Sequence, residues 1–207
     1  MKSSLKIAII GATGNVGSRI KDEALNRGHL VTGIAPVIES PASQTNLTLR
    51  IGDLKDPEAL AEILKGHDVV VSSVKYVDSD PTQLLKALRL AGIKRYLVVG
   101  GAATLEVTPG ITALASGLVP EYNLPEARAA QHFLDVLRST ADIAWTVLIP
   151  PAEFTAGERT GKFRLGEGQF MVDPNGKSAV SFEDFSIALL DEIETPKHLK
   201  DRFAIAY

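Results

Sequence analysis

Three glycines near the N-terminus constrain the fold of this chain more than any other feature. Gly11, Gly14 and Gly17 follow the apolar run 7–10 at three-residue spacing. The first glycine permits a sharp turn from strand to helix, the second lets backbone N–H groups approach a phosphate, and the third lets the new helix pack against the strand. A helix N-terminus that faces a pyrophosphate also stabilises its negative charge. The spacing therefore predicts a dinucleotide-binding turn.

Short apolar runs alternate with amphipathic helical patterns along most of the chain. Strands of a parallel sheet are buried on both faces, so they appear in a sequence as continuous apolar runs. This alternation predicts an α/β fold, a Rossmann-type doubly wound parallel sheet with right-handed crossovers. We expect strands at 5–10, 30–34, 47–51, 68–72, 95–99 and 144–149, and helices at 15–27, 57–64, 81–91 and 125–139.

The composition changes after the last of these strands. Glycines and prolines recur between Pro150 and Gly176 among isolated aromatic side chains, a pattern that predicts loops and a hairpin. A chain of 207 residues suits one compact core. We therefore expect a single NAD(P)-binding Rossmann domain over residues 1–207, with a small C-terminal substrate lobe at 150–180 inside it.

A last helix and strand follow this lobe. Ser181 is a good N-cap for the helix, with Asp184 at the position from which its carboxylate could bond back to the cap. Pro196 ends the helix, and the alternation over 202–207 predicts a final strand.

Composition and charge exclude several function classes. The formal net charge is −3, and Lys and Arg are scattered, so we expect no nucleic-acid partner. Without cysteine the chain has no disulfide, thiolate metal site or cysteine nucleophile, and its four histidines occur singly, so no metal site is expected. No apolar stretch is long enough to span a membrane, so we expect a cytoplasmic protein without membrane association. Whether the chain forms homo-oligomers stays open.

Several motifs together resemble those of one superfamily. The glycine spacing is similar to that of the extended and atypical short-chain dehydrogenase/reductases. Further matches resemble the small NADH-flavin reductases, which belong with NmrA-like and NAD-dependent epimerase/dehydratase-like proteins. The similarity covers nearly the whole chain, from Lys6 to Tyr207. The matching motifs are Gly52-Asp53-Leu54, Gly100-Gly101-Ala102, Thr104-Leu105-Glu106-Val107 and Ser181-Phe182-Glu183-Asp184-Phe185.

The resemblance implies a cofactor site spread over several strand ends. Asp53 and Leu54 would border the adenine, although an acidic residue after glycine also commonly caps a turn. The residues after the fourth strand lie where a cofactor would cross the switch point of the sheet, or they are ordinary loop residues. The expected pyrophosphate residues are Gly11, Thr13, Gly14, Asn15, Val16 and Gly17, and the remaining cofactor residues are Ser72, Ser73, Val74 and Gly100.

Three residues are candidates for the reaction and the substrate. Thr104 matches a position often occupied by serine in relatives, and its hydroxyl would either orient a substrate or the nicotinamide amide, or stabilise the turn after Gly100-Gly101. Pro150 and Phe154 would lie beside the nicotinamide, where Phe154 could stack on a flat acceptor. The alternative for Phe154 is packing within the lobe.

The adenosine end of the site departs from the family pattern. Relatives often have arginine where this chain has Pro36, and an arginine there would bind a 2′-phosphate. Glu39 is the nearest acid and lies beyond that proline. We therefore expect NAD or NADP as cofactor, with a weak preference for NAD, while Arg50 or Lys75 could still reach a phosphate.

The residues expected to form a proton relay also depart from the family pattern. Short-chain dehydrogenases usually carry Tyr-x-x-x-Lys, in which the lysine lowers the pKa of the tyrosine. Tyr122 is followed four residues later by Glu126, whose charge would raise a tyrosine pKa. We therefore expect an NAD(P)H-dependent oxidoreductase that passes hydride to a small planar acceptor, a flavin as substrate or a quinone, because such rings need little proton relay. The alternatives are a nonenzymatic NmrA-like redox sensor and an epimerase or dehydratase.

Overall fold

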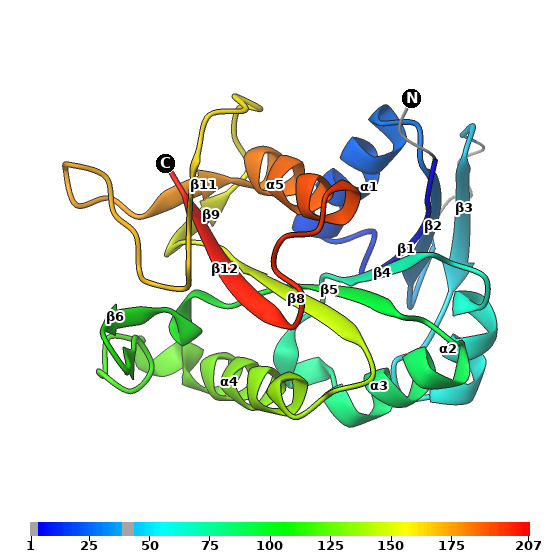
Figure 1. Cartoon of the computed structure of the whole chain (residues 1–207), viewed down its shortest axis with the longest axis horizontal. Helices are drawn as coiled ribbons and strands as arrows, with labels where there is room; N and C mark the ends of the chain where they lie inside the picture. The colour runs from blue at the N-terminus through cyan, green and yellow to red at the C-terminus, as the bar shows by residue number, and fades with distance from the viewer. Residues whose placement is uncertain (1–3, 39–43) are drawn as a thin grey trace.

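The computed structural model describes residues 4–38 and 44–207. Its centre is an eight-stranded sheet in the order β10-β12-β8-β5-β4-β1-β2-β3 (Figure 1). All neighbours in this sheet are parallel except β10, which runs antiparallel to β12. The strands are β1 (Lys6–Ile10), β2 (Leu30–Ala35), β3 (Leu47–Ile51), β4 (Val69–Ser72), β5 (Arg95–Val99), β8 (Ala144–Ile149), β10 (Arg164–Gly166) and β12 (Asp201–Ala206).

Helices cover both faces of the sheet. One face carries α1 and α5, and the other carries α2, α3 and α4 (Figure 1). Alternate residues of β1 enter different cores: Ile7 and Ile9 pack on the α1 and α5 side, and Ala8 and Ile10 on the other. The predicted doubly wound fold is therefore confirmed. The helices are α1 (Asn15–Asn26), α2 (Pro57–Leu64), α3 (Pro81–Leu90), α4 (Leu124–Arg138) and α5 (Phe182–Glu194).

The cap of α5 is only half as predicted. Ser181 Oγ accepts from the backbone N–H of Asp184 at 3.0 Å, as expected. The Asp184 carboxylate does not bond back to the cap; it accepts from the Thr160 hydroxyl, the Gly161 N–H and the Tyr207 hydroxyl. The expected reciprocal cap is wrong because Asp184 is fully buried under the neighbouring segment and finds its donors there. The start of α5 thus fixes residues 160–161 and the last strand together.

The lobe is built differently from the prediction. The described residues between 150 and 180 form no hairpin; instead β9 (Glu153–Thr155) pairs in parallel with β11 (Ala179–Ser181), while β10 joins the main sheet. A hairpin occurs earlier, between β6 (Glu106–Thr108) and β7 (Ile111–Thr112), where Gly110 has a positive φ of 79°. A bridge between Glu106 and Gln169 ties this hairpin to the lobe.

Three short helical turns complete the architecture: η1 (Tyr76–Asp78), η2 (Ala102–Thr104) and η3 (Glu121–Asn123). Each lies near the carboxyl end of a parallel strand or at the start of α4. In the part of the chain that the structure describes, no helix is long and apolar enough to cross a membrane.

Candidate functional site

The glycine turn after β1 adopts a conformation that only glycine fits at two positions. Gly11 has φ +84°, and a Cβ there would lie 2.2 Å from the carbonyl oxygen of Ser73. A Cβ at Gly17 would lie 2.1 Å from the carbonyl oxygen of Gly11. The N–H of Gly11 donates to the carbonyl oxygen of Ile34 at 2.8 Å, so the turn is fixed against the end of β2. These contacts explain the first and third glycines by packing alone.

Gly14 differs because its φ of −72° suits any residue and its surroundings are less crowded. Apart from its chain neighbours and its own helix, a Cβ there would meet only the Gly11 carbonyl oxygen, at 3.3 Å. Gly14 is the N-cap of α1, which has no side-chain cap and no acidic residue in its first turn. An uncapped helix start without a carboxylate suits an anion. Sterically and electrostatically, this cradle fits a pyrophosphate.

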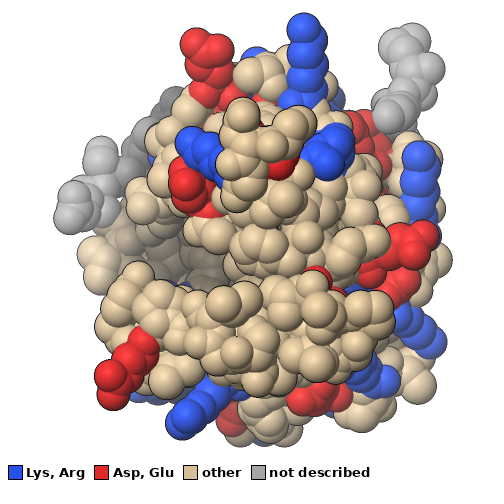
Figure 2. All heavy atoms as spheres, turned by 90° about the vertical axis from the view of Figure 1, so that its left-hand side faces the viewer, with Lys and Arg blue, Asp and Glu red and all other residues tan. Residues whose placement is uncertain are grey.

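Two hollows flank the turn at the carboxyl ends of the strands. The strand-end pocket measures about 380 Å³ and the lobe cleft about 490 Å³, and both are lined by Val74 and Lys75. Figure 2 views the side that carries β6 and β9, and a recess separates the upper and lower halves of that face. The strand-end pocket is lined by Ile10, Gly11, Ile34, Ala35, Pro36, Gly52, Asp53, Leu54, Lys55, Val74, Lys75 and Asp78. The lobe cleft is lined by Gly14, Asn15, Val16, Ser73, Val74, Lys75, Tyr76, Val99, Gly100, Gly101, Ala102, Ala103, Asn123, Glu126, Ala127, Ala130 and Phe154.

Most of the predicted cofactor residues are brought together here. An extended dinucleotide crosses a doubly wound sheet at this switch point, with one nucleoside on each side of the glycine turn. The strand-end pocket would take the adenosine and the lobe cleft the nicotinamide. Gly11, Asp53, Leu54 and Val74 line the first; Gly14, Asn15, Val16, Ser73, Val74, Gly100 and Phe154 line the second.

Other predicted residues lie beside the hollows rather than in their walls. Thr13 is exposed at the turn, whereas Gly17 is buried beneath it. Ser72 is buried, and its hydroxyl is 2.7 Å from the Tyr96 hydroxyl, so its side chain belongs to the core. Pro150 is likewise buried and does not line either hollow. The contacts of these four residues with a cofactor or substrate stay predictions.

Thr104 occupies a structural position. Its hydroxyl donates to the carbonyl oxygen of Gly101 at 2.9 Å, and its side chain is buried. The carbonyl oxygen of Thr104 also accepts from the Arg202 guanidinium. These bonds support the turn-stabilising alternative, because a hydroxyl that is buried and bonded within η2 is not presented to the cleft.

Asp53 has the turn contact of one alternative, and its place in the pocket wall is compatible with the other, the contact with adenine, which stays a prediction. Its carboxylate accepts from the Lys55 N–H at 2.9 Å, the contact of an ordinary turn, and the residue also lines the strand-end pocket. Pro36 lines the same pocket, as do Lys55 and Lys75. The position where relatives often carry an arginine is thus a proline in this wall, with two lysines in the same wall, and the cofactor preference stays a prediction. Glu39 lies outside the described residues.

Several cleft residues were not predicted. The Glu126 carboxylate accepts from the Tyr76 N–H at 2.7 Å and the Val77 N–H at 3.0 Å, which fixes α4 against η1. The Tyr76 hydroxyl donates to the Val99 carbonyl at 2.7 Å, and burial raises its pKa far above the usual range. Asn123 completes this wall. Packing between α4 and η1 brings these residues to the cleft, so no local sequence pattern predicts that they line it.

Tyr122, the candidate for the tyrosine of a proton relay, lies at the surface. Its side chain is 87% exposed and lines neither hollow. Tyr76 is a cleft tyrosine, but its proton is committed to a backbone carbonyl. The described cleft therefore presents no tyrosine poised to exchange a proton.

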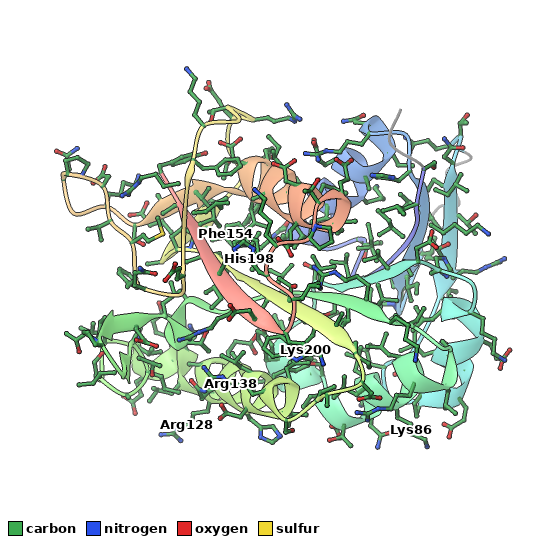
Figure 3. All side chains as sticks on the ribbon, in the orientation of Figure 1. Lys86, Arg128, Arg138, Phe154, His198 and Lys200 are labelled. Carbon is green, nitrogen blue, oxygen red and sulfur yellow. The ribbon has the colours of Figure 1, made fainter. Side chains whose placement is uncertain are left out.

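Phe154 forms the lobe side of the cleft. Its ring centre lies 4.7 Å from that of Phe182 and 4.8 Å from that of Phe185, and the side chain packs on the α5 side of the sheet (Figure 3). Phe154 therefore packs within the lobe, as one alternative predicts, and it also lines the cleft, where its stacking on a flat acceptor stays a prediction.

Glu183 links the helix of the glycine turn to the lobe. Its carboxylate accepts from Arg19 of α1 at 3.1 Å and from the Gly157 N–H at 2.9 Å. Burial alone would raise the pKa of Glu183, but these hydrogen bonds outweigh it and lower the pKa. Glu183 thus connects α1, whose start lines the lobe cleft, to residue 157 of the lobe.

The fold and the site define a Rossmann-type protein that binds a dinucleotide. Residues 11–196 match the model of a family described as NAD(P)H-binding, and the chain belongs to that family. The predicted membership of the atypical short-chain dehydrogenase/reductases with NmrA-like proteins is confirmed.

Close relatives extend over the full chain. The uncharacterized protein YwnB of Bacillus subtilis is 36% identical over 97% of this chain and 98% of its own length. A solved structure from Bacteroides thetaiotaomicron, described as a proposed epimerase, is 37% identical with a TM-score of 0.93 and covers 99% of this chain and 98% of that chain. A proposed NADH-flavin reductase from Streptococcus pneumoniae is 32% identical with a TM-score of 0.82 and covers 98% of this chain and 99% of that one.

Proposed function

We propose that this NAD(P)H-binding protein reduces a planar acceptor, a flavin or a quinone, by hydride transfer. When bound, the dinucleotide supplies the hydride; the acceptor gains that hydride and one proton from water, and the oxidised dinucleotide is released. The protein's part is to hold two flat rings in contact inside the lobe cleft. The Streptococcus pneumoniae relative supports this choice of reaction.

One observation carries the proposal: the cleft joins an apolar wall to a carboxylate and a phenol, those of Glu126 and Tyr76, that are already hydrogen-bonded to the backbone. Phe154, Ala102 and Ala130 line it without offering a proton. Glu126 and Tyr76 hold backbone groups, so neither is free to serve as general acid or base. Reduction of a simple ketone needs such a group, whereas a flavin or quinone ring delocalises the incoming electron pair.

The test follows the absorbance of NADH and NADPH with FMN, FAD, riboflavin and a quinone in turn, beside calorimetric binding of both cofactors. We expect cofactor oxidation that depends on one of these acceptors. Tight binding without turnover of any acceptor would instead identify the NmrA-like sensor. Because the Bacteroides thetaiotaomicron relative is described as a proposed epimerase, the assay also includes a nucleotide sugar. Turnover of that sugar without net cofactor oxidation would support the epimerase alternative.

Tyr122 offers a direct check on the missing proton relay. Because its side chain is exposed and outside the cleft, Tyr122→Phe is expected to change kcat/KM by no more than about twofold. Steady-state rates at several pH values measure this. A loss of about 100-fold, typical of removing a general acid, would place Tyr122 in the reaction after all.

For the cofactor, we propose a weak preference for NAD. Pro36 stands in the strand-end pocket where an arginine would meet a 2′-phosphate. Pro36→Arg is expected to tighten NADPH binding about tenfold, the effect of one modest charge-assisted hydrogen bond, and to leave NADH nearly unchanged. Calorimetry with both cofactors checks this, with Val37→Arg as the control because Val37 is exposed outside the pocket. Equal effects of the two substitutions would contradict the placement.

We also propose a cytoplasmic location, where cells maintain the reduced dinucleotides that such a reaction consumes. Cell fractionation with an antibody to the native protein tests it.

A further inference from the structure

The segment between η2 and η3 has an unusual surface. Residues 107–120 contain no charged side chain. Leu118 in this segment is 67% exposed, Ile111 is 47% exposed, and Tyr122 just beyond is 87% exposed. We call these three side chains the apolar rim. Large apolar groups gathered on one exposed segment commonly mark a contact surface.

The segment that carries the apolar rim meets the lobe cleft at two points. The Leu114 N–H donates to the Ala103 carbonyl at 3.0 Å, and Ala103 lines the cleft. At the other end, Tyr122 is followed directly by Asn123, a residue of the cleft wall. In Figure 2 the band directly below the recess is uncharged, and charged side chains lie at its edges. A molecule whose ring enters the cleft can therefore extend over the rim.

Charge in the cleft disfavours a phosphorylated acceptor. Among the described lining residues, Lys75 is the one cation, and it lines both hollows that flank the glycine turn, so the pyrophosphate at that turn would compete for it. Arg128 of α4 points away from the sheet (Figure 3). The Glu126 carboxylate adds a negative charge to the same wall. A second phosphate in this cleft would lose hydration without gaining a cationic partner.

We propose that the acceptor is an uncharged quinone with an apolar tail, whose ring enters the lobe cleft and whose tail lies on the apolar rim. The inference rests on the proposed reductase function and narrows its acceptor. The ring takes the hydride and one proton from water and becomes the hydroquinone, while the tail stays unchanged. Burial of even a few methylenes of the tail would strengthen productive binding severalfold each.

The experiment compares two quinones with the same dimethoxy-methyl ring, one without a tail and one with a decyl chain, together with riboflavin and FMN. NADH oxidation is followed below the concentration at which the tailed quinone forms micelles. We expect kcat/KM to be about tenfold or more higher for the tailed quinone and higher for riboflavin than for FMN. Leu118→Asp should reduce the ratio between the two quinones to near one.

Leu90→Asp is the matched control. Leu90 is 51% exposed on α3, outside the rim and the cleft, so this variant should keep the tail preference of the original protein. Thermal unfolding of both variants confirms that each is folded. Three results would overturn the inference while leaving the reductase function intact. These are equal kcat/KM for the two quinones, a higher kcat/KM for FMN than for riboflavin, and an equal loss of the tail preference in Leu118→Asp and Leu90→Asp.

Two further outcomes are distinct. Turnover of none of the acceptors would overturn the proposed function and this inference together. Concentration-dependent association that Leu118→Asp abolishes, without any tail preference, would assign the rim to a second copy of the chain and overturn the tail site.

Discussion

Replacing Gly14 by leucine is expected to weaken binding of NADH and NADPH about 100-fold while the protein stays folded. A Cβ at Gly14 would lie 3.3 Å from the Gly11 carbonyl oxygen, a tight contact that a shift of a few tenths of an ångström relieves, so the side chain itself can be accommodated. It would stand in front of the uncapped start of α1 and keep a pyrophosphate from the backbone N–H groups. Loss of two charge-assisted hydrogen bonds, at about 1.5 kcal/mol each, corresponds to about 100-fold in Kd. Calorimetric titration with each cofactor measures the effect.

Asp56→Leu is the control for this substitution. Asp56 caps α2, its carboxylate accepts from the Ala59 N–H at 2.9 Å, and it lines neither hollow. A leucine there removes a helix cap at a cost of about 1 kcal/mol, comparable with placing leucine at the cap of α1. The control should therefore lose stability without losing affinity. Unchanged cofactor affinity in Gly14→Leu would reject the glycine turn as the binding site.

The largest loss of stability is expected from Glu192→Ala. Glu192 of α5 has a buried carboxylate that accepts from the Arg95 guanidinium at 2.9 Å, from the Lys197 and His198 N–H groups, and from the His198 ring at 2.8 Å. Burial lowers the pKa of Arg95, and the charge of Glu192 opposes this decrease. Removing the carboxylate leaves a buried cation without its partner, which costs about 3–5 kcal/mol. Thermal unfolding should show Tm lower by roughly 6–20 °C.

The pair Arg89 and Asp142 provides the comparison. Its distances are similar, with the Arg89 guanidinium donating to both carboxylate oxygens at 2.8 and 3.0 Å against one bond at 2.9 Å in the buried pair, but both side chains are about half exposed. Asp142→Ala should change Tm far less, because solvent screens an exposed pair. Replacing Arg95 and Glu192 together by methionine should recover part of the Glu192→Ala loss. Equal Tm changes in Glu192→Ala and Asp142→Ala would show that burial does not set the strength of the Glu192 contact.

The main sheet could be predicted because its signals are local. Continuous apolar runs mark strands buried on both faces, and the observed bounds of β3, β5 and β8 match the predicted ones. The short strands of the lobe could not be predicted. Strands of three residues such as β9 and β11 carry too little periodicity, and their parallel pairing joins segments far apart in sequence.

The candidate site divides in the same way. The glycine turn is predictable because it requires a positive φ and a close approach between backbone segments, and glycine permits both. Thr104 and Glu126 could not be assigned from sequence, since their roles depend on which backbone groups happen to face them. Only the packing of η2 and of α4 against η1 shows that both side chains are occupied by hydrogen bonds.

Because β12 lies between β8 and β10, the main sheet cannot be completed until residues 201–206 are synthesised. Residues 164–166 pair in the main sheet with residues 204–206, and β8 has β12 as its second neighbour. Until β12 is synthesised, β8 presents an open edge with unpaired backbone groups, the kind of surface at which nascent chains associate. Substitutions that weaken β12 are therefore expected to lower the yield of properly assembled protein more than they lower its affinity for the cofactor.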